Sequence, residues 1–296
     1  MMKITKNRIS ALMLLLVALC MLCTSVGCGG IDVDTQLPSE SGNSETDEIS
    51  SIEEINSLRE DYGLGSCKSL CGEVAVILFY VDDFESSWTV EQRRSFTEEE
   101  ILPGLEFLEK EAEKHGVELS LKLKKTYSAR YRDDVVIDVK DSGLATIDVL
   151  TQSAGSIGFE SDEYMLGYFR SIYHSEDVIC LTVFNKNGTS YAINPKRDAD
   201  VVVEEHCIIF ARDKNSQGDA RGSQASIVAH EILHLFGAED MYAIPSRKKL
   251  AQRLYASDIM LGASYNIATN NIGEATAFYI GWTDRVPSVL YNKGWN

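Results

Sequence analysis

The chain has 296 residues, of which 44% are hydrophobic and 25% are charged. This length and composition suit one sizeable domain or two small ones. The formal net charge is −17, and so acidic a protein would repel phosphate backbones, which argues against a nucleic-acid-binding function.

The first 28 residues have the features of an export signal. Basic side chains precede an apolar run from Ala11 to Cys23, which is shorter than the roughly 20 residues that a membrane-spanning helix needs. The segment from Thr24 to Gly29 resembles a bacterial lipobox, in which Cys28 would receive lipid, although Ser25 stands where Leu or Val is usual. We therefore expect a membrane-anchored lipoprotein at the cell surface or in the periplasm. The alternative is an ordinary signal peptide and a secreted protein.

Residues 29–66 are expected to form a flexible, acidic tether. Between Gln36 and Ser51 the sequence is mostly Ser, Glu, Asp, Gly, Asn and Thr, which offers too little apolar surface to fold. The folded domain is assigned to residues 67–296, with an upper part at 67–237 and a lower part at 238–296.

Four cysteines lie in this folded domain. Cys67 and Cys71 lie close together in a glycine-flanked loop, and outside the cell such a pair favours a small disulfide. The alternative is that one of them is a thiolate that blocks a metal site before activation. Cys180 and Cys207 each lie in an apolar run, so they are predicted to be buried thiols or a bridge between strands.

Hydrophobic patterns predict alternating strands and helices. The predicted strands are Val74–Val81, Val117–Leu123, Val135–Val139, Asp177–Phe184, Tyr191–Ile193 and Val201–Phe210, with a turn at Asn187–Gly188. The predicted helices are 97–116, Ser161–Tyr173 and Asn271–Ile280, the first opened by a capping box between Thr97 and Glu100. This order implies a mixed, mostly parallel sheet with helices packed on it.

The residues of greatest chemical interest lie in the segment HEILHLFGAED, from His230 to Asp240. On a helix, residues four apart lie on one face, so His230 and His234 can bind one metal ion while Glu231 reaches a water molecule on it. Gly237 suits the left-handed residue that ends a helix, and the returning chain would bring Asp240 to the ion as a third ligand. Three protein ligands leave one position open for water, which is the arrangement of a catalytic zinc site.

Chance is a poor explanation of this pattern. A bare H-E-x-x-H arises by accident in many proteins, but the added glycine and ligand-type residue are expected in only about 10⁻⁴ of chains of this length. From Ala225 to Phe236 the polar residues are Ser226, His230, Glu231 and His234. A helix that is apolar nearly all round is buried, and burying two imidazoles and a carboxylate is costly unless a metal satisfies them. The sequence therefore predicts one zinc ion per chain.

A methionine follows in a predicted tight turn, Met260 within Ser257–Gly262. Together with His230–Asp240, this turn resembles the metzincin clan of zinc metalloproteases, which carries H-E-x-x-H-x-x-G-x-x-H/D and then a methionine turn. The resemblance implies that His230, His234 and Asp240 hold the zinc. It also implies that Glu231 is the general base and that Met260 forms a hydrophobic floor under the zinc.

Other features of the clan carry over less directly. The aspartate ligand is similar to that of the snapalysin branch, although the remainder of this chain does not match that branch. Some metzincins have a zinc-contacting tyrosine two residues after the methionine, where this chain has Gly262; Tyr265 is a candidate to replace it. The clan also has an antiparallel edge strand that aligns an extended peptide over the zinc, and Ser190–Asn194 is the candidate for that strand.

The fold implied by the resemblance is α+β and zincin-like, with a long active-site helix and a smaller, mostly helical C-terminal part. The implied function is that of an extracytoplasmic zinc-dependent endopeptidase, a monomer that acts on protein or peptide substrates. Zinc lowers the pKa of its bound water towards about 7, and Glu231 would take a proton as that water attacks a peptide carbonyl.

Two alternatives stay open. One is a surface binding lipoprotein whose zinc site is structural or vestigial, but a structural site does not need a base such as Glu231. The other is a zinc hydrolase of a non-peptide bond, which substrate profiling would distinguish from a protease.

Overall fold

The computed structural model describes residues 67–131, 144–193, 206–213, 224–263 and 266–295. All of these ranges belong to one compact unit, which lies within Thr46–Asn296. No helix within the described ranges is long and apolar enough to cross a membrane. The predicted export signal, the lipid anchor at Cys28, the tether and the strand at Val135–Val139 lie outside the described residues.

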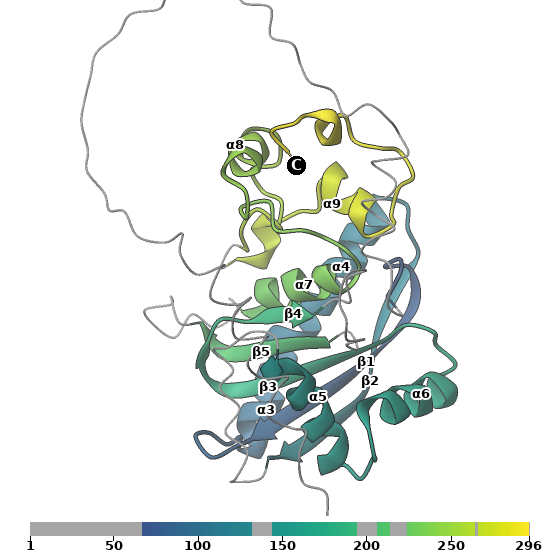
Figure 1. Ribbon diagram of the computed structural model, residues 1–296, viewed down its shortest axis with the longest axis vertical. Coiled ribbons are helices and arrows are strands. Elements are labelled where there is room, and N and C mark those ends of the chain that lie inside the picture. The colour runs from purple at the N-terminus through teal and green to yellow at the C-terminus, as the bar shows by residue number, and fades with distance from the viewer. Residues whose placement is uncertain (1–66, 132–143, 194–205, 214–223, 264–265, 296) are drawn as a thin grey trace, which may run out of the picture. The chain divides into compact units, whose positions relative to one another are not determined.

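A five-stranded sheet forms the centre of the described chain (Figure 1). Its strands lie in the order β2-β1-β3-β5-β4, and all neighbours are parallel except β4, which pairs antiparallel with β5 at one edge. The strands are β1 (Gly72–Asp82), β2 (Leu119–Arg130), β3 (Val178–Gly188), β4 (Tyr191–Ile193) and β5 (His206–Asp213). The predicted α+β fold with a mixed, mostly parallel sheet is therefore confirmed.

Helices cover both faces of this sheet, which explains why β1 is an unbroken apolar run. Val76 and Leu78 of β1 belong to a buried cluster with α4 and α7, whereas Ile77 and Phe79 belong to a second cluster with α5 and α6. The helices of this part are α3 (Val90–Phe96), α4 (Leu102–Lys114), α5 (Leu144–Ser156), α6 (Asp162–Tyr173) and α7 (Gln224–Leu235). Of these, α5 was not predicted from the sequence.

The first helical segment begins earlier than predicted. Its capping box joins Thr89 and Gln92, each side chain bonding the backbone N–H of the other. A π-helix, η1 (Thr97–Ile101), then connects α3 to α4 without a break. The predicted capping box of Thr97 and Glu100 is therefore wrong, because both residues lie inside a continuing helix.

The N-terminus of α7 is held by η1 and α4. The Glu100 carboxylate, only 5% exposed, accepts a hydrogen bond of 2.9 Å from the Ala225 N–H. A carboxylate is favourable there because the N-terminus of a helix carries partial positive charge. At Gly104 of α4, a Cβ atom would lie 2.9 Å from the Ala225 carbonyl oxygen and 3.0 Å from Val228 Cγ1. The close approach of the two helices therefore requires glycine, and it fixes α7 against its support.

The C-terminal part gathers at one end of the described chain in Figure 1. It was predicted to be mostly helical, but its described residues are mainly turns and loops that connect four short helices. Its helices are α8 (Pro245–Leu254), η2 (Ile267–Thr269), α9 (Glu274–Tyr279) and η3 (Ser288–Tyr291), of which α8 was not predicted. Two side chains hold it in place: Glu111 of α4 accepts the Ile272 N–H at 3.1 Å, and His115, which follows α4 directly, donates from Nε2 to the Ile272 carbonyl at 2.9 Å. The C-terminal part is thus docked on the same helix that supports α7.

The cysteines differ partly from expectation. Cys67 is wholly buried and Cys71 is exposed, so their side chains leave the loop in different directions and form no disulfide. The loop is fastened instead through Leu70, whose N–H donates to the Ile280 carbonyl at 2.9 Å and whose carbonyl accepts from Trp282 at 2.6 Å. Cys180 and Cys207 are buried thiols in the two different clusters, which rules out a bridge between them.

The turn between β3 and β4 falls slightly later than predicted. Asn187 and Gly188 still belong to β3, and the chain reverses at residues 189–190. The short strand that follows, β4, is the antiparallel edge strand expected at Ser190–Asn194.

Candidate metal centre

The helix α7 ends in the way that its glycine predicts. Gly237 has a φ of +99°, its N–H donates to the His234 carbonyl, and the Ala238 N–H donates to the Leu233 carbonyl, each at 3.1 Å. This pair of bonds is a Schellman motif, which satisfies the last carbonyls of the helix and reverses the chain. The reversal returns the next residues, including Asp240, to the face of α7 that carries the histidines.

Three side chains meet at that face. His230 Nε2 and His234 Nε2 lie 3.1 and 3.3 Å from Asp240 Oδ1, and the two Nε2 atoms lie 3.2 Å apart. A tetrahedral ion with bonds of about 2.0–2.1 Å, the length of zinc–nitrogen bonds, would hold its ligand atoms about 3.3 Å from one another. Among the described residues, no other group of three or more ligand-type side chains is brought together in this way.

Backbone carbonyls orient both imidazoles. His230 Nδ1 donates to the Ile259 carbonyl at 3.0 Å, and His234 Nδ1 donates to the Ala238 carbonyl at 2.7 Å. A carbonyl can only accept, so each Nδ1 carries a hydrogen, and in the neutral ring Nε2 has a lone pair directed at the other ligands. The two rings are therefore held in the tautomer that metal binding requires.

The electrostatics of the cluster also suit a cation. Burial alone would lower the pKa of His230, but Asp240, the charge of Glu231 and the Ile259 carbonyl outweigh it and raise the pKa to about 9. Burial alone would raise the pKa of Asp240, but contacts with both imidazoles hold it well below its usual range. Within the described residues Asp240 Oδ1 is a buried oxygen that accepts no well-formed hydrogen bond. The site thus favours positive charge at the point where the three ligand atoms converge, and the residues present fit a divalent metal ion.

Glu231 lies beside this point and is nearly buried, with 6% exposure. Burial raises the pKa of its carboxyl, while the charges of His230 and His234 and a backbone hydrogen bond from Ala192 act in the opposite direction. Ala192 belongs to β4, so the edge strand and α7 meet at this carboxylate. A buried carboxyl with a raised pKa is suited to receive a proton near neutral pH.

The neighbouring carboxylate, Glu239, points elsewhere. It forms an ion pair with Arg247 of α8, whose Nε donates to the Trp295 carbonyl at 2.6 Å. The Arg247 guanidinium also lies over the Trp295 ring, 5.7 Å from its centroid. Glu239 is therefore occupied in anchoring the C-terminal segment, and Asp240 is the carboxylate directed at the histidines.

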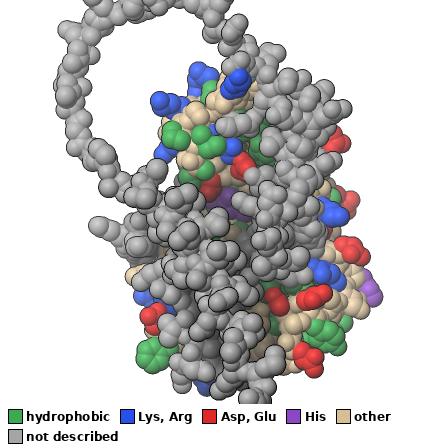
Figure 2. All heavy atoms as spheres, viewed as in Figure 1, with side chains coloured by type: hydrophobic (Ala, Val, Ile, Leu, Met, Phe, Trp, Pro, Cys, Tyr) green, Lys and Arg blue, Asp and Glu red, His purple; other side chains and the backbone are tan. Residues whose placement is uncertain are grey.

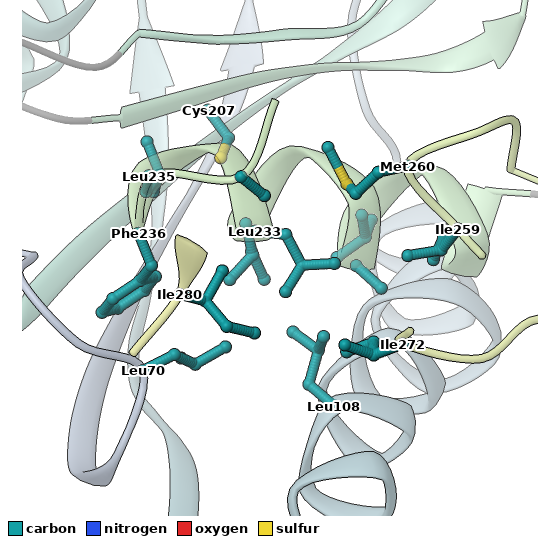
Figure 3. Packing of buried hydrophobic residues seen from close by; sticks show 14 of the residues in the cluster. Leu70, Leu108, Cys207, Leu233, Leu235, Phe236, Ile259, Met260, Ile272 and Ile280 are labelled. Carbon is teal, nitrogen blue, oxygen red and sulfur yellow. The ribbon is translucent and has the colours of Figure 1, made fainter. Parts of the chain in front are cut away.

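Met260 is wholly buried in the turn that carries the carbonyl partner of His230. Figure 3 shows it close to α7, in the cluster that includes Ile259 and Ile272. Its carbonyl accepts a hydrogen bond of 2.9 Å from the Met241 N–H. Because Met241 follows Asp240 directly, this bond ties the methionine turn to the segment that carries the third ligand-type residue.

The sequence analysis missed Tyr242. Its ring lies parallel to that of His230, with centroids 6.4 Å apart and an interplanar angle of 11°. Burial, the charge of Asp240 and a hydrogen bond to Asp240 raise the pKa of its phenol. Its position two residues after Asp240 is the signal that could have identified it. The other tyrosine considered, Tyr265, lies outside the described residues, and Gly262 is exposed.

The site is accessible from one face of the molecule. Figure 2 shows a histidine side chain, with acidic side chains nearby, between the sheet-bearing part and the C-terminal part of the described chain. His234 and Asp240 keep 21% and 29% of their side-chain surface exposed. The site is therefore partly exposed at the side chains of His234 and Asp240, whereas the ligand atom Asp240 Oδ1 is buried.

Comparisons with known proteins give a distant structural likeness. No protein-family description and no curated protein sequence matches the chain. A solved structure that it resembles is metalloproteinase-II from Bacteroides fragilis, with 11% sequence identity and a TM-score of 0.32 over 75% of this chain. The chain spans 60% of that protein's length. So distant a likeness does not establish a shared activity.

Proposed function

We propose that this chain is a zinc-dependent endopeptidase whose metal is held by His230, His234 and Asp240. The observation that carries the proposal is the triangle of two Nε2 atoms and Asp240 Oδ1, with sides of 3.1–3.3 Å. The buried carboxylate of Glu231 lies beside this triangle and is not one of the three ligand atoms. Three protein ligands leave a fourth position for water, and a structural site would fill that position with protein.

Zinc is the metal that the donor set favours. Two imidazole nitrogens and one carboxylate oxygen form a common catalytic zinc site, whereas magnesium and calcium prefer oxygen ligands throughout. Carbonyl groups behind both imidazoles supply the second layer of hydrogen bonds that fixes the ring orientation.

Glu231 is proposed to transfer the proton. Bound zinc supplies a Lewis acid that acidifies a water molecule and polarises the scissile carbonyl. Glu231 would accept a proton from the attacking water and would then give it to the departing amine. Its burial supports this role, because bulk water has little access to the proton that the carboxyl would carry.

Two further features support a peptide as the substrate. The edge strand β4 meets Glu231 at Ala192, and an extended peptide that added to this edge would pass alongside the proton-transfer group. Tyr242 keeps its phenolic proton at neutral pH, so it can donate a hydrogen bond to the oxygen on which negative charge develops. A zinc site with only a structural role would need neither feature.

Purified protein should contain about one zinc per chain and should cleave denatured casein. Elemental analysis of protein prepared without chelator measures the first, and release of acid-soluble peptide measures the second. A chelator should abolish cleavage, and zinc added after its removal should restore it. Metal content near zero that added zinc does not restore would contradict the metal centre. Zinc binding without cleavage of any protein substrate would favour a non-peptide hydrolase.

Membrane attachment through Cys28 is a separate proposal that rests on the sequence alone. Cys28→Ser should release the protein into the medium or leave an unprocessed precursor, because the lipid acceptor is lost. Cys23→Ser is the matched control, since Cys23 lies within the apolar run and should not carry lipid. Fractionation and mass measurement of the mature protein compare the two. Unchanged membrane association and processing in Cys28→Ser would show that the lipobox assignment is wrong.

A further inference from the structure

We propose that Asp258 is a positioning residue for the metal centre, which strengthens His230 as a ligand through the peptide group that joins Ile259 to Met260. This role rests on the metal-binding part of the proposed function. The Asp258 carboxylate does not touch the metal, but it is connected to the ligand His230 by hydrogen bonds through one intervening peptide group.

A single peptide group connects the two side chains. Its oxygen, the Ile259 carbonyl, accepts the hydrogen of His230 Nδ1 at 3.0 Å. Its nitrogen, the Met260 N–H, donates to Asp258 Oδ1 at 2.8 Å. The carboxylate, the peptide and the imidazole therefore form a continuous chain of hydrogen bonds that ends at Nε2, the atom directed at the metal.

Asp258 is buried to a degree that is unusual for an aspartate, with 1% exposure. Its two oxygens accept hydrogen bonds from three groups: besides the Met260 N–H, the Gly273 N–H lies at 2.8 Å and the Thr276 hydroxyl at 2.9 and 3.0 Å. An ionised carboxylate is an acceptor without hydrogens of its own, so these donors stabilise the charged form. Burial raises the pKa of this carboxyl, and the hydrogen bonds from Met260, Gly273 and Thr276 act in the opposite direction.

The approach of Gly273 has a specific geometric requirement. A Cβ atom at this position would lie 2.8 Å from Asp258 Oδ2, closer than real Cβ contacts come. The backbone of the C-terminal part thus comes as near to the carboxylate as a residue without a side chain permits. The turn is held further by the Leu261 N–H, which donates to the Asp258 carbonyl at 3.0 Å.

This arrangement affects the electronic properties of His230. Linked hydrogen bonds polarise one another, so a negative charge accepting from the peptide N–H makes the Ile259 carbonyl a stronger acceptor. A stronger acceptor at Nδ1 raises the basicity of Nε2, as a carboxylate does when it contacts a metal-bound histidine directly. Asp258 would do the same from one peptide further away.

A purely structural role is the competing explanation, and Thr276 separates the two. The Thr276 hydroxyl bonds Asp258 from α9 and contributes to packing, but it is not part of the chain that leads to His230. Thr276→Val removes this donor with little change of volume and leaves the Met260–Asp258 bond. Asp258→Asn keeps the shape of the side chain but removes its negative charge.

The experiment compares wild type, Asp258→Asn and Thr276→Val. Zinc affinity is measured by competition with a chromophoric chelator, and thermal unfolding of the metal-free proteins is measured in parallel. Imidazole N–H proton shifts are measured by NMR on the zinc-loaded proteins. Asp258→Asn should weaken zinc binding about 10- to 100-fold and move the His230 Nδ1–H signal upfield. The His234 Nδ1–H, bonded to Ala238, should not move and serves as the internal control.

Thr276→Val should lower the unfolding temperature but keep wild-type zinc affinity. If both variants lose zinc affinity in step with their loss of thermal stability, Asp258 is only structural and the proposal is overturned. If Asp258→Asn does not fold, Thr276→Val decides: retained affinity at reduced stability supports the proposal, and weakened affinity overturns it. A wild-type protein that binds no zinc would overturn the metal centre and, with it, the role of Asp258.

Discussion

Replacing Glu231 with glutamine should reduce peptide hydrolysis by about 10³-fold while zinc remains bound. Glutamine has nearly the same shape, so it can occupy the same buried position between α7 and β4. It cannot accept and return a proton, and general acid–base catalysis is the contribution that would be lost. The measurement is kcat/KM on a fluorogenic peptide, with the zinc content of each preparation determined alongside.

Glu239→Gln is the matched control for this experiment. Glu239 is a carboxylate of the same segment, but it pairs with Arg247 rather than facing the histidines. The same chemical change should therefore leave kcat/KM close to the wild-type value. Comparable activity in wild type and Glu231→Gln would show that another group moves the proton.

The parts of the site that were predictable depend on local geometry. The spacing of His230 and His234 places them on one helical face whatever surrounds the helix, and Gly237 ends that helix through bonds within the segment itself. The position of Asp240 was also predictable, because the chain reversal at Gly237 restricts the conformations that the next three residues can adopt. The same holds for β1, whose unbroken apolar run requires cover on both faces.

The parts that were missed depend on contacts between distant segments. Asp258 forms hydrogen bonds with Gly273 and Thr276, which lie 15 and 18 residues away in the sequence. No local pattern around Asp258 indicates that these residues are its partners. Glu100 was assigned to a local capping box, but its partner is the Ala225 N–H, 125 residues away. Local propensity favoured the nearer bond, and tertiary packing of η1 against α7 decided otherwise.

Each ligand-type side chain of the proposed centre is held by a different part of the fold. The carbonyl that accepts from His230 comes from the methionine turn, and the carbonyl that accepts from His234 comes from Ala238, in the reversal that follows α7. Asp240 is followed directly by Met241, whose N–H donates to the Met260 carbonyl in the methionine turn. The C-terminal part therefore controls the geometry of a site whose histidines belong to the sheet-bearing part.

Loss of the Asp240 carboxylate should weaken zinc binding far more than loss of the adjacent Glu239 carboxylate. Zinc sites with four ligands bind with roughly 10–16 kcal/mol, or about 3–4 kcal/mol per ligand, so Asp240→Ala should lower the affinity about 10²- to 10³-fold. Asp240→His should keep part of the affinity, because imidazole is also a good zinc ligand.

Glu239→Ala should behave in the opposite way. It leaves the three ligand atoms in place, so zinc affinity should stay near the wild-type value. It removes the carboxylate partner of Arg247, a guanidinium with 8% of its side-chain surface exposed, and the free energy of unfolding should fall by roughly 2 kcal/mol. Chelator competition and urea unfolding of the metal-free protein, applied to all three variants, measure both quantities. The assignment of the third ligand is falsified if Glu239→Ala loses zinc while Asp240→Ala keeps it.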